Sequence, residues 1–221
     1  MAILVIATHP DDEVLGCGGT IACHTDRDDE VHVLIVTRGT PDIFQAEQVE
    51  ETRQELQAAH QVLGVHQAHF LDFPAPKLDK IPGHELADSI RKALYSIQPD
   101  TVYLPHRGDI HADHRAVYYA TLVAARPVNN CSVRRLLCYE TLSETEWAPP
   151  FGDDIFIPTV FVDISRYMDR KLQAMACYHS QLKQPPHPRS LQSIESLARL
   201  RGGTANLHAA EAFMLVREIL D

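Results

Sequence analysis

The sequence predicts a single α/β domain over residues 1–221, with a mostly parallel sheet that carries helices on both faces. Three observations lead to this prediction. Apolar runs of strand length recur along the chain without the apolar–polar alternation of half-buried strands, as expected for strands buried on both faces. Stretches with helical periodicity lie between these runs. The length of 221 residues and a hydrophobic content of 45% are sufficient for one large core.

The predicted elements alternate between strand and helix along the chain. Residues 2–7 are the clearest strand, because six consecutive apolar residues leave no polar face. Residues 16–22 open a helix whose glycines allow close packing, and these glycines follow the strand too late for a dinucleotide-binding fingerprint. The pattern of residues 209–220 allows a helix. The other predicted strands are residues 31–37, 68–71, 100–105 and 160–163, and the other predicted helices are residues 45–63, 83–97, 116–125 and 169–178.

Composition and charge narrow the function classes. The formal net charge is −10, from 20 Lys and Arg against 30 Asp and Glu, and this balance argues against nucleic acid or an anionic membrane as the main partner. No apolar run is long enough to span a bilayer, and the chain enters its first strand without a signal-peptide pattern. The five cysteines form no CxxC pair and are typical of reduced thiols in a cytoplasmic protein. Thirteen histidines favour a metal site.

The most informative stretch is residues 8–13, Thr-His-Pro-Asp-Asp-Glu, directly after the first strand. A buried strand cannot continue through this charge, so the chain emerges at the carboxyl edge of the sheet, where open α/β folds bind ligands. His9 and Asp12 are one tight turn apart and can both bind a single Zn²⁺, whereas Asp11 projects differently and can accept a proton from the metal-bound water. The alternative is the acidic first turn of a capped helix. A third ligand is needed to decide between them.

A second polar stretch, residues 106–115, follows the predicted strand 100–105. Parallel strands place both polar turns at the same edge of the sheet. His111 and His114 share one face of a helical turn, so one can complete a His/Asp/His zinc set while the other lies beside the metal-bound water. Asp113 can orient a neighbouring imidazole. The matching strands before both turns favour zinc over a merely polar helix N-terminus.

The two motifs together, His-Pro-Asp-Asp-Glu at residues 9–13 and His-Ala-Asp-His at residues 111–114, resemble the PIG-L/LmbE-like family of zinc-dependent N-deacetylases. The resemblance covers most of the chain. It implies a Rossmann-like three-layer sandwich in which the last segment forms a closing strand. Members of the family often form homo-oligomers, which is an expectation here too. Weaker similarity extends to residues 37–39, 53–64, 171–181 and 210–213.

The resemblance implies a catalytic site with one Zn²⁺ per chain, with Fe²⁺ as the alternative in the cell. The implied metal ligands are His9, Asp12 and His114. Asp11 would be the general base that takes a proton from the metal-bound water as it attacks an amide. A protonated His111, held in place by Asp113, would stabilise the oxyanion. Whether Asp11 or His111 returns a proton to the leaving amine stays open.

The implied reaction removes an N-acetyl group from an N-acetylated amino sugar or its conjugate. Arg53 matches the family's substrate-binding arginine, and Arg38 is a second candidate for contact with hydroxyls or an anionic group. Asp109 stands where some members carry a tyrosine that assists catalysis. Loops at residues 72–82 and 184–189, together with the loop after residue 39, are expected to form the upper wall of the pocket, and such loops decide the substrate.

Two other function classes stay open. A metal-dependent phosphoesterase commonly uses two bridged metal ions, so a count of about two metals per chain would favour it. A non-catalytic, carbohydrate-binding relic of the fold is the other alternative, and the intact Asp11 and His111 argue against it. The isolated histidines His106, His179 and His208 are more often structural than part of a pocket.

Overall fold

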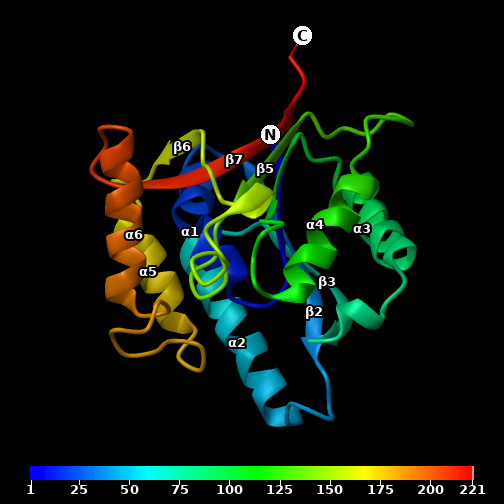
Figure 1. The fold of residues 1–221 in the computed structure, drawn as a ribbon, viewed down its shortest axis with the longest axis horizontal. Coiled ribbons are helices and arrows are strands. Elements are labelled where there is room, and N and C mark those ends of the chain that lie inside the picture. Colours follow the sequence, from blue (N-terminus) through cyan, green and yellow to red (C-terminus); the bar gives the residue numbers. More distant parts are fainter. Residues whose placement is uncertain (221) are drawn as a thin grey trace.

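The computed structural model describes residues 1–220, which form one seven-stranded sheet in the order β3-β2-β1-β4-β5-β7-β6 with helices on both faces (Figure 1). The predicted Rossmann-like α/β fold is confirmed. The strands are β1 (Ala2–Ala7), β2 (Glu30–Gly39), β3 (Gln67–Ala75), β4 (Thr101–Pro105), β5 (Arg135–Tyr139), β6 (Val160–Asp163) and β7 (Ala210–Glu218). The helices are α1 (Asp12–Thr25), α2 (Ala46–Leu63), α3 (Gly83–Ile97), α4 (Ala112–Ala124), α5 (Met168–Cys177) and α6 (Leu191–Thr204), and two 3₁₀ turns are η1 (Leu78–Lys80) and η2 (Gly152–Asp154).

The strand order brings the two polar motifs together. Strands β1 to β5 are parallel, whereas β7 is antiparallel to both of its neighbours, β5 and β6. β1 lies between β2 and β4. The carboxyl ends of β1 and β4 are therefore adjacent, and the chain crosses from one side of the sheet to the other between them, as at the ligand-binding crevice of open α/β sheets.

Two hydrophobic cores lie on opposite faces of the sheet. Successive strand residues point to opposite faces, so Val5 of β1 belongs to the first core and Leu4 to the second. The first core includes Met175 of α5 and Ile194 of α6, and the second includes Ile90 of α3. Figure 1 shows α3 and α4 on one side of the sheet and α1, α2, α5 and α6 on the other. The three-layer prediction is therefore confirmed.

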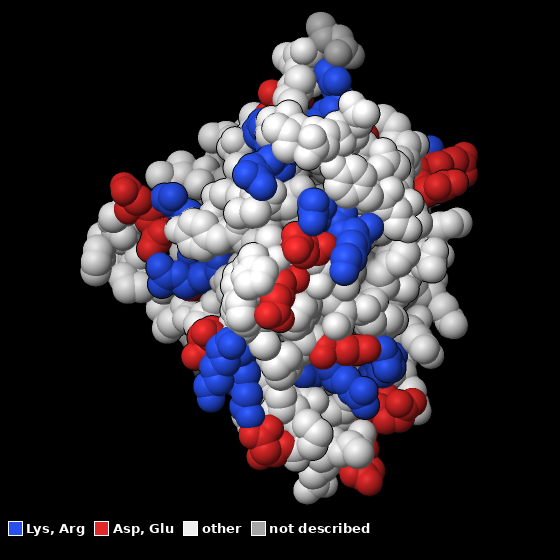
Figure 2. All heavy atoms as spheres, turned by 90° about the vertical axis from the view of Figure 1, so that its right-hand side faces the viewer, with Lys and Arg blue, Asp and Glu red and all other residues white. Residues whose placement is uncertain are grey.

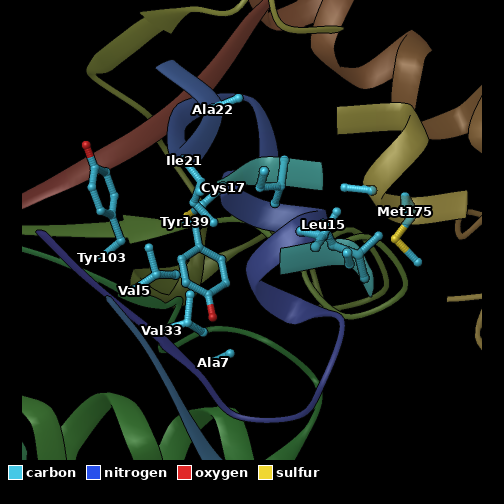
Figure 3. Close-up of a cluster of buried hydrophobic side chains, with 14 of the residues drawn as sticks. Val5, Ala7, Leu15, Cys17, Ile21, Ala22, Val33, Tyr103, Tyr139 and Met175 are labelled. Carbon is cyan, nitrogen blue, oxygen red and sulfur yellow. The ribbon is translucent and has the colours of Figure 1, made fainter. Parts of the chain in front are cut away.

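Close packing holds α1 against the sheet. Figure 3 shows the ring of Tyr139 from β5 lying beside α1 in the first core. A Cβ atom on Gly16 would lie 2.2 Å from Cδ2 of that ring, so only glycine allows this approach. The Tyr139 hydroxyl also donates to the Ile6 carbonyl at 2.8 Å, and Cys17 is buried in the same core. This packing fixes the loop from β1 to α1, which carries the first polar motif.

The secondary structure differs from the prediction in several places. Helices α1 and α4 begin earlier than predicted, because residues of the polar motifs form their first turns. Residues 72–75 were expected in a loop but extend β3, which pairs with β2 beyond a register shift. The last segment is the strand β7, so the helical alternative is wrong. β5 and α6 were not predicted; β5 is a run of only five residues.

Charged side chains of both signs are mixed on the face of the molecule that Figure 2 shows. On the face formed by the α3 and α4 side of the molecule, basic and acidic groups lie in small neighbouring clusters, and no large basic area is visible there (Figure 2). Within residues 1–220, no helix has both the length and the apolar character needed to cross a bilayer.

Candidate metal centre and adjoining cavity

Three side chains converge where β1 and β4 end. The Nδ1 atom of His9 lies 3.5 Å from Oδ2 of Asp12 and 3.3 Å from Nε2 of His114. The third side of this triangle, from Asp12 Oδ2 to His114 Nε2, is 3.2 Å. Two nitrogen ligands of a tetrahedral zinc ion, each about 2.0–2.1 Å from the metal, are roughly 3.3 Å apart. The donor set and its spacing therefore fit one zinc ion.

The second nitrogen of each imidazole is held by a carboxylate. His114 Nδ1 lies 2.8 Å from Oδ2 of Asp109, and His9 Nε2 lies 3.3 Å from Oδ2 of Asp113. Such carboxylates fix the tautomer of a metal-binding histidine and leave the other nitrogen lone pair free. Asp12 adds a further sign of an ion site, because its Oδ1 is buried without a hydrogen-bond partner. Asp109 thus holds His114, a candidate metal ligand, and its position two residues before His111 did not predict this contact.

The electrostatics of the centre favour a cation. Burial opposes ionisation of Asp12, but His114 and His9 hold the pKa of its carboxyl well below the usual value. Burial likewise opposes protonation of His114, but Asp12 and Asp109 hold its pKa well above the usual value. The carboxylates therefore stabilise positive charge at the point where the three donor atoms meet. A divalent cation can take the place of that proton.

Asp11 lies beside this centre without belonging to the triangle of donor atoms. It is buried, and its backbone adopts the left-handed conformation with φ of 109° at the N-cap of α1. Its N–H donates to Oε2 of Glu13 at 3.1 Å, and Tyr178 donates to the other oxygen of Glu13 at 2.6 Å. A conformation that costs about 1–3 kcal/mol persists only where such contacts enforce it. The conformation of the polar turn is therefore stabilised by Glu13 of α1, which is itself held by Tyr178 at the end of α5.

Arg189 binds Asp11 and was not among the predicted site residues. Its Nη1 donates to Oδ2 of Asp11 at 2.8 Å, its Nε donates to Ser143 Oγ at 2.7 Å, and its Nη2 lies 3.5 Å from Oε1 of Glu144. Burial raises the pKa of Asp11 to about 7, although the Arg189 guanidinium opposes this shift. Only the loop that carries Arg189 was predicted, as a wall of the pocket. A carboxylate with this pKa can exchange protons near neutral pH.

His111 is held by the backbone of α4. As the N-cap residue, it accepts the Asp113 N–H on Nδ1 at 3.1 Å, so the proton of the neutral ring lies on Nε2. Burial, together with His9 and His114, lowers the pKa of His111 to about 4. This lowered pKa favours the neutral ring over the protonated imidazole that the resemblance implies. Asp113 holds His111 through its backbone N–H, whereas its carboxylate hydrogen-bonds to His9 through one oxygen and accepts the Leu78 N–H of η1 at 3.0 Å through the other.

Comparison with known proteins identifies the family. The model for PIG-L, described as GlcNAc-PI de-N-acetylase, matches residues 4–125 of this chain. The chain belongs to the PIG-L family. An uncharacterized deacetylase of Escherichia coli strain K12, YaiS, is 31% identical over 185 residues, which cover 80% of this chain and 90% of the relative. The predicted resemblance is confirmed, and the protein is an enzyme of the deacetylase class.

A second relative and one solved structure are also similar to most of this chain. A diacetylchitobiose deacetylase of Thermococcus kodakarensis is 30% identical over 188 residues, which cover 81% of this chain and 69% of that protein. The crystal structure of a conserved protein from Thermus thermophilus superposes with a TM-score of 0.76 at 28% identity and covers 99% of this chain and 96% of the other.

A cavity of about 420 Å³ adjoins the candidate PIG-L metal centre. Arg38 and Arg53 both line it. The Arg53 guanidinium lies 4.3 Å from the centroid of the Phe70 ring and 3.7 Å from Oδ1 of Asp72. The cavity wall contains none of the three isolated histidines that were expected to be structural. It brings together His9, Asp11, His111, Arg189, Glu144, Arg38 and Arg53.

Proposed function

We propose that this protein is a zinc-dependent deacetylase that removes the N-acetyl group from an N-acetylated amino sugar or a conjugate of one. The observation that carries the proposal is the triangle of donor atoms from His9, Asp12 and His114 at the wall of a cavity that Asp11 and His111 also line. A zinc ion held there would act as a Lewis acid and lower the pKa of its bound water to about 7.

Asp11 is the general base in this proposal. It lines the cavity, is outside the donor triangle, and has a pKa of about 7, so it can take a proton from the attacking water at neutral pH. Its ion pair with Arg189 orients one carboxylate oxygen and favours the ionised form. The proton moves from water to Asp11 as the new carbon–oxygen bond forms at the acetyl carbonyl.

His111 donates a hydrogen bond as a neutral imidazole. With Nδ1 occupied by the Asp113 N–H, the Nε2–H group is the donor left for the oxygen that becomes negative in the tetrahedral transition state. A neutral ring has no spare proton for the leaving nitrogen. Asp11, which has just gained a proton from water, therefore returns it to that nitrogen as the carbon–nitrogen bond breaks. The products are acetate and the free amine.

The cavity supports a sugar-sized substrate. Arg53 is packed on Phe70 and presents its remaining donors to the cavity, where they can bind hydroxyls or an anionic group. Arg38 lies exposed at the carboxyl end of β2 and lines the same wall. The family description and the diacetylchitobiose deacetylase relative both name N-acetylglucosamine-containing compounds, and this supports the choice of substrate class.

Acetate release on a panel of N-acetylglucosamine derivatives tests the proposal. The panel contains the free, phosphorylated, nucleotide-linked, lipid-linked and β-1,4-linked forms, and bound zinc is measured in parallel. We expect the wild type to release acetate from at least one of them. Asp11→Asn should keep its zinc and lose about 10²–10⁴-fold in rate, because asparagine tolerates positive φ but cannot act as a base. Asp79→Asn, an exposed carboxylate outside the cavity, is the matched control.

The outcomes separate the parts of the proposal. Zinc binding without acetate release from any panel member would remove the amino-sugar substrate. A wild type that binds no zinc at His9 and His114 would remove the metal site. Release of inorganic phosphate from the phosphorylated derivatives, without acetate, would favour a phosphoesterase instead.

A further inference from the structure

A second group of histidines lies at the opposite end of the parallel strands. His32 is near the start of β2, His66 directly precedes β3, and His69 is near the start of β3. His32 is in register with Leu4 of β1, and His69 is in register with Leu34 of β2. Both leucines belong to the core beneath α3 and α4, so the two imidazoles lie on that face of the sheet.

The side chains of this amino-end cluster are in contact. His32 Nδ1 lies 3.1 Å from Nε2 of His69, close to the roughly 3.3 Å expected between two ligands of tetrahedral zinc. The ring of His32 is 5.1 Å from the ring of His66, centroid to centroid. One ligand atom from each of Glu30, His32 and His66 lies within 4.8 Å of the other two. His32 therefore touches an imidazole on either side, with a carboxylate within reach.

The four side chains have the chemistry of metal ligands. An imidazole is mostly neutral near pH 7 and then has a lone pair to donate to a metal ion. Glu30 and His66 are exposed and can turn toward His32 without disturbing the core. Imidazole with one carboxylate suits zinc and copper, and the net charge of −10 favours cations generally.

A hydrogen bond between neutral imidazoles can by itself account for the His32–His69 contact. It does not account for a third imidazole and a carboxylate that each place a ligand atom within 4.8 Å of one on His32. We propose that Glu30, His32, His66 and His69 form a second site for a borderline divalent metal ion, with zinc as its occupant. Because β3 is the edge strand, a bound ion would cross-link the edge of the sheet to β2.

Zinc content of paired variants tests this site. The double variant His66→Asn/His69→Asn removes two ligands from positions that are not fully buried, and His84→Asn on α3 is the exposed-histidine control. After equilibration with a small excess of zinc and gel filtration, we expect about two zinc ions per chain in the wild type and the control and about one in the double variant. Far-UV circular dichroism verifies that each variant is folded.

A second set of variants, made in a His9→Asn parent, measures zinc at the amino-end cluster without a contribution from the carboxyl-end site. His9→Asn disables the carboxyl-end site and should keep about one zinc, which is lost when His66→Asn/His69→Asn is added. Copper in place of zinc should give nitrogen hyperfine structure in the electron paramagnetic resonance spectrum of His9→Asn. The proposal is wrong if the double variant keeps the wild-type zinc count, or if folded His9→Asn holds no zinc. Either result leaves the deacetylase proposal untouched, and two ions at opposite strand ends would not indicate a bridged phosphoesterase centre.

Discussion

Two groups of histidines lie at opposite ends of the parallel strands and are held in different ways. At the carboxyl end, His9 and His114 each hydrogen-bond through one ring nitrogen to a buried carboxylate. Burial lowers the pKa of both imidazoles, but the neighbouring carboxylates have the larger effect and raise it. At the amino end, His32 and His69 contact each other, and their pKa values are lowered. The imidazoles of the first group are therefore held in fixed orientations, as in a preformed metal site. The second group has candidate ligands but no carboxylate that orients them, so an ion bound there would have to order the exposed side chains.

The largest expected effect follows from removing a carboxyl-end ligand. His114→Ala leaves Asp109 buried without its imidazole partner and leaves Asp12 with His9 alone. We expect loss of zinc from this site and a fall in kcat/KM of at least about 10³-fold, because a bound ion contributes several kcal/mol of transition-state stabilisation. The free energy of unfolding should fall by about 3–5 kcal/mol, as when one partner of a buried ion pair is removed. Zinc analysis, acetate release and urea titration measure these effects.

A variant in the amino-end histidine group is the control for His114→Ala. His66→Ala removes an imidazole from the amino-end cluster and should leave acetate release at the wild-type level. Equal losses of activity in the two variants would contradict the separation of the two ends.

A smaller effect is expected when the orienting carboxylate is neutralised. In Asp109→Asn the amide oxygen can still accept the His114 Nδ1–H, and Thr145 keeps its partner at this position, but the negative charge is gone. We expect zinc affinity to fall about 10–100-fold, the usual effect of losing such an outer carboxylate. Competition with a chelator of known zinc affinity measures this. An unchanged affinity would mean that Asp109 serves the fold rather than the metal.

The ion pair of Asp11 should be visible in the pH profile. The Arg189 charge favours ionised Asp11, so Arg189→Met should raise the pKa of Asp11 further. Since ionised Asp11 is the base in the proposed mechanism, the acidic limb of kcat/KM should move to higher pH by about 1 unit. Activity then falls about tenfold at pH values below that limb and changes little above it. Arg189→Lys keeps the charge and should keep the limb near its wild-type position. A uniform loss at every pH would instead indicate a structural role.

The convergence of His9, Asp12 and His114 could be predicted because each belongs to a polar stretch that begins directly after a buried strand. Parallel strands then bring these stretches together without further information. Arg189 could not be predicted in this way, because it lies 178 residues from Asp11 and meets it only through the packing of a loop. The contact of Asp109 with His114 could not be predicted from the sequence either. Its position is readable, but which imidazole it contacts depends on the path of the chain between β4 and α4.

The closing strand shows the same limit in the fold. β7 contains Glu211, which makes its segment resemble the polar face of a helix. In the structure Glu211 is buried, because it accepts the N–H groups of Gly19 and Thr20 at 2.9 and 2.7 Å and pairs with Lys171 of α5 at 2.5 Å. Its partners come from two distant helices. A buried, fully partnered carboxylate cannot be distinguished from an exposed one by local pattern alone.

The smallest expected effect is a difference in acid sensitivity between the two ends in metal-free protein. With lowered pKa values, His32 and His69 bind fewer protons in the folded than in the unfolded chain, so folding stability declines as pH falls below the unfolded pKa of about 6.5. The exposed Glu30 opposes this shift only weakly. The raised pKa values of His9 and His114 have the opposite sign, because their contribution is present below about pH 6.5 and is lost as pH rises through the folded value.

His69→Gln should therefore reduce the acid sensitivity of the fold. With a chelator present, urea midpoints are compared at about pH 7.5 and about pH 5.5, on either side of the unfolded histidine pKa. The decrease on acidification should be smaller in His69→Gln than in the wild type, since one proton-excluding imidazole is gone and His32 loses a neighbour that opposes its protonation. His84→Gln should leave the decrease unchanged, because His84 is exposed. A larger decrease in His69→Gln would show that contact between the two rings stabilises a shared proton, and the contrast between the two ends of the strands would then be lost.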